Sequence, residues 1–303
     1  MNYNIDKQLN DFKKNIYSQS GEDGILEEII NRLGHKSDKV CCEFGAADGI
    51  HLSNTYNLIK NKNFSGILIE SVKSDYLKMC KNIPDKKIIK LNALVSDEGN
   101  NSLENILQKH HIKYDFDLLS IDIDGNDYYI LKSLVKYKPK IIVIEYNPTI
   151  PNDYEFVQDR NTNINQGASI LSIFKLAKKK DYELVAITDA NAIFVYESYF
   201  KEIVKKENHI NDLRNDKEIK NYIFYGYDGK VFTSQKLFLP WHSIGLNEIK
   251  ILPKFLQKYR REYNLFQRII YLILLIFNKR KKLKIWISNP VKYIKIFYKF
   301  IKY

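Results

Sequence analysis

Residues 39–49, K-V-C-C-E-F-G-A-A-D-G, join an apolar run to a turn that contains two glycines and two acidic residues. An apolar run of this kind is typical of a strand in a parallel sheet, because helices cover both faces of such a sheet. Ligands of open α/β sheets bind beyond the carboxyl ends of the strands. The stretch therefore predicts a strand over Lys39–Phe44 and a ligand-binding turn after it, with candidate residues Glu43, Gly45, Ala46, Asp48 and Gly49.

Apolar runs and helical spacing alternate along the chain on both sides of that stretch. The expected strands are 39–44, 66–70, 87–95, 116–123, 140–146, 182–188 and 191–196. The expected helices are 23–33, 54–59, 74–80, 102–110, 129–135 and 168–179. The short T-D-A-N segment between the last two strands indicates an antiparallel pair. The fold class is α/β: a Rossmann-like, doubly wound, mostly parallel seven-stranded sheet, with a C-terminal helical basic extension.

The length, the hydrophobic fraction and the cysteine count indicate the general class of protein. With 303 residues and 45 % hydrophobic side chains, the chain is long and apolar enough for one or two folded domains, which excludes a disordered protein. Three cysteines, Cys41, Cys42 and Cys80, do not form a disulfide framework, and no secretory signal follows Met1. We therefore expect a cytoplasmic location.

The net charge of +12 is concentrated at one end. Residues 251–303 hold fourteen Lys and Arg against one acidic residue, which is +13, and residues 1–250 sum to −1. A main body without positive charge argues against a nucleic acid as partner.

The strand ends favour a nucleoside ligand without a diphosphate. Glu70 ends the second expected strand, 27 residues after Glu43, where its carboxylate can accept hydrogen bonds from ribose hydroxyls. Asn92 and Ala93 end the third, where an adenine edge can be read. The turn after Phe44 lacks the G-x-G-x-x-G pattern and carries acids that would repel a diphosphate.

These residues resemble the class I S-adenosylmethionine-dependent methyltransferases, and further motifs narrow the resemblance. S-I-D-I-D-G-N-D, residues 120–127, is similar to the I-D-V-E-G-x-E signature of the FkbM-type O-methyltransferases, with Asp124 and Asp127 in place of two glutamates. Y-S-Q-S-G-E-D-G-I-L-E-E (17–28), D-G-I-H-L-S-N-T (48–55), V-I-E-Y-N-P (143–148) and Q-G-A-S (166–169) also resemble that family. The resemblance covers residues 17–196.

The resemblance implies methyl transfer from S-adenosyl-L-methionine to a hydroxyl of a sugar or glycan precursor, as in surface polysaccharide biosynthesis. Asp122 is the first candidate for the catalytic base and His51 the second. The implied cofactor-binding residues are Gln19, Glu43, Gly45, Ala46, Asp48, Gly49, Glu70, Asn92, Ala93 and Asp122. Three acids could instead hold Mg²⁺, namely Asp122, Asp124 and Asp127.

Purely structural roles for these residues stay open as alternatives. Glu43 and Glu70 could cap loops, the two glycines could serve only the turn, and the aspartates could make structural hydrogen bonds. Two rival functions also remain: a nucleotide-sugar oxidoreductase, and a non-catalytic nucleoside-binding or membrane-tethered assembly protein.

The expected domains are 1–196, a methyltransferase domain; 197–254, an extension or cap of it; and 255–303, a basic amphipathic tail. Leu265–Phe277 is apolar but, at about 20 Å as a helix, too short to cross a bilayer of roughly 30 Å. In 292–302, lysines recur at 3-4-3 spacing and form one stripe of a helix. We expect residues 265–303 to contact an anionic membrane surface, with packing on the domain or in a homo-oligomer as the alternative. The acceptor is then a small-molecule or lipid-linked glycan, methylated at the inner membrane face.

Overall fold

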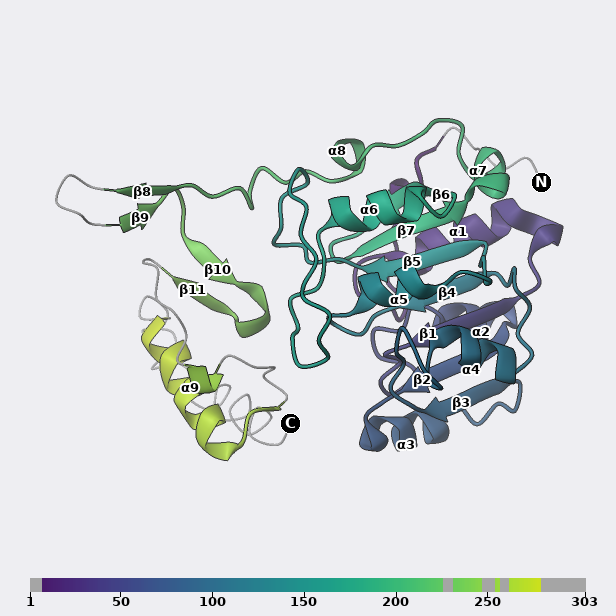
Figure 1. Cartoon of the computed structure of the whole chain (residues 1–303), viewed down its shortest axis with the longest axis horizontal. Coiled ribbons are helices and arrows are strands. Elements are labelled where there is room, and N and C mark those ends of the chain that lie inside the picture. The colour runs from purple at the N-terminus through teal and green to yellow at the C-terminus, as the bar shows by residue number, and fades with distance from the viewer. Residues whose placement is uncertain (1–6, 226–230, 247–253, 257–261, 279–303) are drawn as a thin grey trace. The chain divides into compact units, whose positions relative to one another are not determined.

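The strands that the sequence predicts assemble into one seven-stranded sheet in a computed structural model of the chain, which describes residues 7–225, 231–246, 254–256 and 262–278 (Figure 1). The order across the sheet is β3-β2-β1-β4-β5-β7-β6. Neighbours from β3 to β5 pair in parallel, and β7 pairs antiparallel with both β5 and β6. The strands are β1 Val40–Phe44, β2 Ser65–Glu70, β3 Ile88–Asn92, β4 Leu118–Ile121, β5 Ile141–Glu145, β6 Tyr182–Ile187 and β7 Asn191–Tyr196.

Helices cover both faces of this sheet and enclose two separate cores. The helices are α1 Glu22–Leu33, α2 Tyr56–Lys62, α3 Lys73–Asn82, α4 Leu103–Lys109, α5 Asp127–Ser133, α6 Ile170–Lys178, α7 Glu197–Ile203 and α8 Ile210–Leu213. Apolar residues of α4, α5 and α6 bury against one face, and those of α1, α2, α3 and α7 against the other. Because successive side chains of a strand point to opposite faces, Cys41 belongs to one core and Cys42 to the other. Both cysteines are buried in the core.

The element predictions hold, with differences at the ends of two strands. β3 ends at Asn92 and β4 covers only Leu118–Ile121, although apolar residues continue beyond both. Asp117 is the physical reason at the start of β4. Its buried carboxylate accepts hydrogen bonds from the backbone N–H of Val40 at 3.0 Å and from Lys140 Nζ at 2.9 Å, so its side chain fixes the entry to β1, β4 and β5.

The chain divides into two compact units, Met1–Ile219 and Lys220–Tyr303. This division falls inside the segment 197–254, which the sequence assigns to a single extension. α7 and α8 lie in the first unit, whose sheet positions the candidate site.

The second unit is built from short hairpins and one helix. Its elements are β8 Ile223–Tyr225, β9 Val231–Thr233, β10 Leu237–Leu239, β11 Ile244–Leu246, the 3-10 turn Lys254–Leu256 and α9 Leu265–Asn278. β8 pairs with β9, and β10 with β11, both antiparallel. The helical expectation for 265–277 is confirmed, whereas the lysine stripe of 292–302 lies outside the described residues. No helix in the described part of the chain is long and apolar enough to cross a membrane.

Candidate functional site

Five parallel strands end at the same edge of the sheet and bring most of the predicted site residues together there. Their last residues, in sheet order, are Asn92 of β3, Glu70 of β2, Phe44 of β1, Ile121 of β4 and Glu145 of β5. The turns that follow these strands therefore form the candidate site, as the crevice rule for open α/β sheets predicts.

The turn after β1 lies directly against the end of β4. Gly45 has φ +76°, and a Cβ there would lie 1.6 Å from the main-chain oxygen of Asp122. Ala46 N–H donates to Ile69 O at 3.1 Å, which joins the same turn to β2. Gly45 thus allows a close approach of backbones that no side chain permits. This close approach is a sufficient structural reason for glycine at position 45. A cofactor contact at Gly45 and Ala46 stays a prediction.

Glu70 links the turns after β1 and β2. Its buried carboxylate accepts hydrogen bonds from Ala47 N–H at 2.8 Å and from Val72 N–H at 2.6 Å. Asn92, exposed at the end of β3, donates from its side-chain amide to Glu70 O and Ser71 O. The three neighbouring strand ends therefore form one hydrogen-bonded rim. Ribose binding by Glu70, and adenine contacts of Asn92 and of half-buried Ala93, remain predictions.

Glu43 is committed to the loop that follows the turn. Its buried carboxylate accepts hydrogen bonds from Ser53 Oγ and Thr55 Oγ1, both at 2.6 Å, and from Asn54 N–H at 2.8 Å. Burial nevertheless raises the pKa of Glu43, although these hydrogen bonds lower it. These contacts are those of a loop-capping acid and explain the H-L-S-N-T motif. These hydrogen bonds form without a ligand, so a ligand contact of Glu43 stays a prediction.

The rest of the turn is held by local hydrogen bonds. Asp48 Oδ1 accepts from Ile50 N–H at 3.0 Å and from His51 N–H at 2.8 Å. Gly49 has φ +80° and faces Met79 and Ile83 of the region around α3. His51 is exposed on this turn, as is Gln19 in the loop before α1. The structure shows no side-chain contact that assigns a role to either.

The N-terminal motif S-G-E-D-G, residues 20–24, lies next to the turn after β1. Asp23 Oδ2 accepts hydrogen bonds from the backbone N–H groups of Ile16, Tyr17 and Ser18, at 2.6–2.8 Å. Glu22 accepts from Thr188 Oγ1 and from Asn191 Nδ2 at the start of β7. Both acids are buried, and they fold the N-terminal loop onto the edge of the sheet.

Three half-buried carboxylates meet beyond β4 and β5. Asp122, Asp124 and Glu145 each have a carboxylate oxygen within 4.8 Å of the others, and together they form a group that could hold a metal ion. Burial first, and then the neighbouring acids, raise the pKa of both Asp122 and Glu145 well above the usual range. Because like charges repel in this setting, the group favours bound protons or a cation.

Asp127 lies outside that group, and its place among the metal candidates stays a prediction. Its two carboxylate oxygens accept hydrogen bonds from Ile123 N–H at 2.9 Å and Gly125 N–H at 2.8 Å. Burial raises its pKa to about 6. The third carboxylate of the group belongs to Glu145. The sequence signal for Glu145 was an acid at the end of an apolar strand, the same signal that marked Glu43 and Glu70.

The loop after β5 packs against the end of β4. Gln158 is buried and donates from Nε2 to Asn126 Oδ1 at 3.0 Å and to Ile164 O at 2.8 Å, while its Oε1 accepts from the N–H groups of Gln166 and Gly167. A Cβ at Gly125 would lie 2.9 Å from Ile164 O. Gly125 and Gln158 therefore let this loop lie beside the acidic group, a role that sequence reasoning missed.

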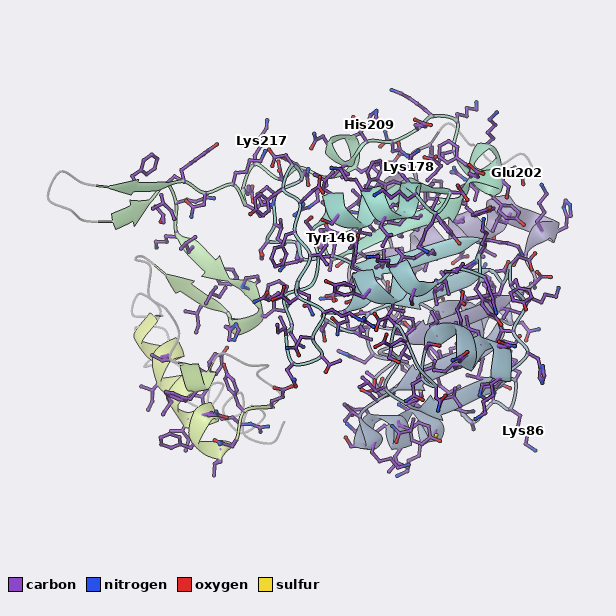
Figure 2. All side chains as sticks on the ribbon, viewed as in Figure 1. Lys86, Tyr146, Lys178, Glu202, His209 and Lys217 are labelled. Atoms are coloured by element: carbon purple, nitrogen blue, oxygen red, sulfur yellow. The ribbon has the colours of Figure 1, made fainter. Side chains whose placement is uncertain are left out.

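Two arginines hold the same loop at its ends. Arg160 pairs with Asp97 at 2.7 Å and Glu98 at 2.8 Å, beyond β3. Arg214 donates to Ile150 O and Pro148 O, and its guanidinium lies 5.0 Å from the ring centroid of Tyr146. Tyr146, labelled in Figure 2, directly follows β5 and is buried. The loop is thereby attached on both sides of the candidate site.

Comparison with protein families gives a match over part of the chain. Residues 99–184 match the family model "Methyltransferase FkbM domain". Over these residues the match agrees with the resemblance that the motifs indicate: residues 99–184 are similar to the FkbM methyltransferase domain, a family whose implied cofactor is S-adenosylmethionine. Asp122, Asp124, Glu145 and Gln158 all lie within the matched residues. No curated protein sequence matches the chain.

Solved methyltransferase structures show a distant likeness. The carbon methyltransferase of CurJ is 9 % identical, with a TM-score of 0.41, and the alignment covers 59 % of this chain and 56 % of that one. The N-terminal domain of EvdMO1 with SAH bound is 11 % identical, with a TM-score of 0.36 and coverage of 59 % and 81 %. A SAM-dependent methyltransferase from Aquifex aeolicus is 9 % identical, with a TM-score of 0.34 and coverage of 56 % and 87 %. The chain thus spans little more than half the length of the first of these proteins.

Proposed function

We propose that the FkbM-type domain transfers a methyl group from S-adenosylmethionine to a hydroxyl group of a sugar or glycan precursor. The observation that carries the proposal is the position of the acidic group: Asp122, Asp124 and Glu145 lie at the carboxyl edge of the sheet and inside residues 99–184, which match the family model. Surface polysaccharide biosynthesis is the setting that this acceptor class favours.

The cofactor would occupy the rim formed by the turns after β1, β2 and β3. Bound there, S-adenosylmethionine supplies an electrophilic methyl group on a positively charged sulfur. The acidic character of the rim, with Asp48 and Glu70, suits a ligand of that charge better than a diphosphate. Glu70 would exchange a backbone hydrogen bond for one from a ribose hydroxyl, and Asn92 and Ala93 would border the base.

Asp122 is the candidate base. It follows β4 directly, between the glycine turn on one side and Glu145 on the other. Asp122 would accept the proton of the acceptor hydroxyl as the acceptor oxygen took the methyl group, and the cofactor would leave as S-adenosylhomocysteine. Burial raises the pKa of Asp122, and a carboxylate with a raised pKa is a better proton acceptor than an ordinary one. His51, exposed on the turn, is the second candidate.

The acidic group also fits a divalent cation. Asp122, Asp124 and Glu145 would hold Mg²⁺, which prefers oxygen ligands and would relieve the repulsion that raises their pKa values. A bound cation would orient an acceptor hydroxyl and lower its pKa. The loop of residues 149–166, held by Gln158 and Arg160, would border the acceptor.

Methyl transfer is tested with S-adenosylmethionine carrying a labelled methyl group and a panel of nucleotide sugars and lipid-linked glycans. We expect label in an alkali-stable product, because methyl ethers resist alkali whereas methyl esters do not. Asp122→Asn should lower the rate at least about 100-fold, the usual contribution of a positioned base. Asp115→Asn, an exposed acid before β4, is the matched control and should act as the wild type. An alkali-labile product, or full activity of Asp122→Asn, would contradict the proposal.

A further inference from the structure

The α9 helix, Leu265–Asn278, carries apolar residues around nearly its whole circumference. Its sequence, L-F-Q-R-I-I-Y-L-I-L-L-I-F-N, has a single charged residue, Arg268. A helix that is apolar all round is normally buried on every side or lies in lipid. The contacts of α9 therefore need an explanation.

One side of α9 packs inside its own unit. Tyr271 is buried in a core with Ile244, Leu256 and Tyr263, and the Tyr263 and Tyr271 rings lie 5.8 Å apart. Gln267, also buried, donates from Nε2 to Phe255 O at 2.6 Å. These contacts fix which side of the helix faces the unit.

A reciprocal pair of hydrogen bonds fixes the start of the helix. Asn264 Oδ1 accepts from Gln267 N–H, and Gln267 Oε1 accepts from Asn264 N–H, both at 3.0 Å. Such a capping box defines a helix N-terminus. Arg268 Nε donates to Tyr263 O at 2.9 Å, so the guanidinium also lies near this end.

The opposite side of α9 is apolar and exposed. Leu265, Ile269 and Ile273 follow one another at a spacing of four residues, with Phe266 beside them, and 45–66 % of each side chain's surface is accessible. This spacing places them on one helix face, which we call the exposed face of α9. Exposed apolar side chains gathered on one face mark an interaction surface.

The charge around α9 indicates what this surface contacts. N-K-R-K-K-L-K follows from the last residue of the helix, and residues 251–303 carry a charge of +13. Each Lys or Arg close to an anionic bilayer contributes about 1 kcal/mol to binding. At 14 residues, α9 is about 21 Å long, too short to span roughly 30 Å of hydrocarbon.

We propose that the exposed face of α9 docks on an anionic lipid surface, with the helix lying in the plane of the membrane and the positive charge of residues 251–303 adding electrostatic attraction. This surface belongs to the second unit, whereas the carboxyl edge of the sheet belongs to the first, and the proposal does not depend on methyl transfer. A second copy of the chain is a weaker candidate, because two segments of charge +13 would repel each other. A nucleic acid would use the charge but not the exposed apolar face.

Co-sedimentation of the full chain with lipid vesicles tests this proposal. The wild type should bind vesicles that contain phosphatidylglycerol and should bind pure phosphatidylcholine vesicles much less, with binding weakened by added salt. The variant Phe266→Ser/Ile269→Ser/Ile273→Ser should bind at least about tenfold less, because it loses three apolar contacts without touching the buried side.

Two further variants make the result specific. Lys281→Gln/Lys282→Gln/Lys284→Gln should also reduce binding to phosphatidylglycerol vesicles at least about tenfold. The matched control, Leu77→Ser/Leu94→Ser/Val135→Ser, removes three equally exposed apolar side chains from the first unit and should bind as the wild type does. Circular dichroism and cofactor binding should be unchanged in all three.

Four outcomes would overturn the proposal. The first is absence of vesicle binding by the wild type. The second is equal loss of binding in the control variant. The third is that the wild type does not bind vesicles and is a dimer by light scattering, whereas Phe266→Ser/Ile269→Ser/Ile273→Ser is a monomer. This result would assign the exposed face of α9 to contact with a second copy of the chain. Binding to DNA that is insensitive to the α9 substitutions, with no binding to vesicles, would also overturn it.

Discussion

The Cα of Gly45 lies so close to Asp122 that a Cβ at position 45 would be 1.6 Å from the Asp122 main-chain oxygen. This contact joins the first candidate cofactor turn to the first candidate base. It also explains why the turn after β1 begins with glycine, independently of any ligand. The geometry of the candidate site thus depends on the packing of two strand ends.

Gly45→Ala should destabilise the protein strongly, because the new Cβ must displace the backbone of β4 and the residue keeps a left-handed φ of +76°. We expect a loss of at least about 3 kcal/mol in the free energy of unfolding, measured with denaturant. Gly99→Ala is the matched control: φ is +75°, but nothing lies within 4 Å of the added Cβ. It should cost only about 1 kcal/mol. Equal losses in the two variants would show that the close approach to Asp122 is unimportant.

Gln158→Ala should detach the loop after β5 from the end of β4. The side chain makes five hydrogen bonds while buried, and its removal leaves several of their partners unsatisfied. The free energy of unfolding should fall by about 2–3 kcal/mol, and proteolysis within residues 149–166 should accelerate. Gln108→Ala, at an exposed site on α4, should change neither quantity. An unaltered proteolysis rate in Gln158→Ala would contradict this account of the loop.

Lys140→Met tests the buried ion pair at the edge of the sheet opposite the candidate site. Lys140 is buried and pairs with Asp117 at 2.9 Å, so removing its charge leaves the Asp117 carboxylate buried without that partner. We expect a loss of about 3–5 kcal/mol in the free energy of unfolding. Lys138→Met breaks an exposed pair with Asp181 and should cost about 1 kcal/mol or less. If the exposed pair costs as much as the buried one, burial is not the cause.

The acidic group makes stability depend on pH and on divalent cations. Burial raises the pKa values of Asp122 and Glu145, and raises that of the neighbouring Asp127 to about 6, so the folded protein holds protons that the unfolded chain has already lost. This contribution to stability is therefore lost as pH rises above about 4. With EDTA present, Tm should fall between pH 5 and pH 8 by about 5 °C. Mg²⁺ should raise Tm more at pH 8 than at pH 5, since protons then compete less for the carboxylates.

Asp122→Asn/Glu145→Gln should weaken both the pH dependence and the Mg²⁺ effect, while Asp115→Asn should leave them unchanged. A Tm that is insensitive to Mg²⁺ at every pH would exclude a cation site at Asp122, Asp124 and Glu145.

The strands and helices of the first unit could be predicted because their apolar periodicity is strong and their ends carry ordinary signals. Ser102 and Ser169, for example, each begin a helix by accepting a backbone N–H hydrogen bond. The doubly wound, mostly parallel sheet could be predicted for the same reason, since continuous apolar runs are typical of a sheet covered on both faces. The order of its strands was not predicted.

The fine arrangement of the site could not be predicted in the same way. A sequence shows that Glu43, Glu70 and Asp127 end strands or begin turns, but not that backbone and hydroxyl donors already occupy their carboxylates. Gln158 lies in a stretch without periodicity, and its five side-chain hydrogen bonds form only when residues 126 and 158–167 are brought together by the fold. Glu145 was visible as an acid at a strand end, yet its approach to Asp122 depends on the register between β4 and β5.

The central claim, a cofactor site at the carboxyl edge of the sheet, is tested most directly by calorimetric titration with S-adenosylhomocysteine and, separately, with NAD⁺. The account predicts saturable binding of S-adenosylhomocysteine at one site, no binding of NAD⁺, and at least about tenfold weaker binding in Glu70→Gln, which retains one acceptor oxygen. Glu104→Gln, a glutamate on α4 away from the rim, serves as the control and should bind as the wild type. Binding of NAD⁺ instead, or full affinity for S-adenosylhomocysteine in Glu70→Gln, would contradict the account.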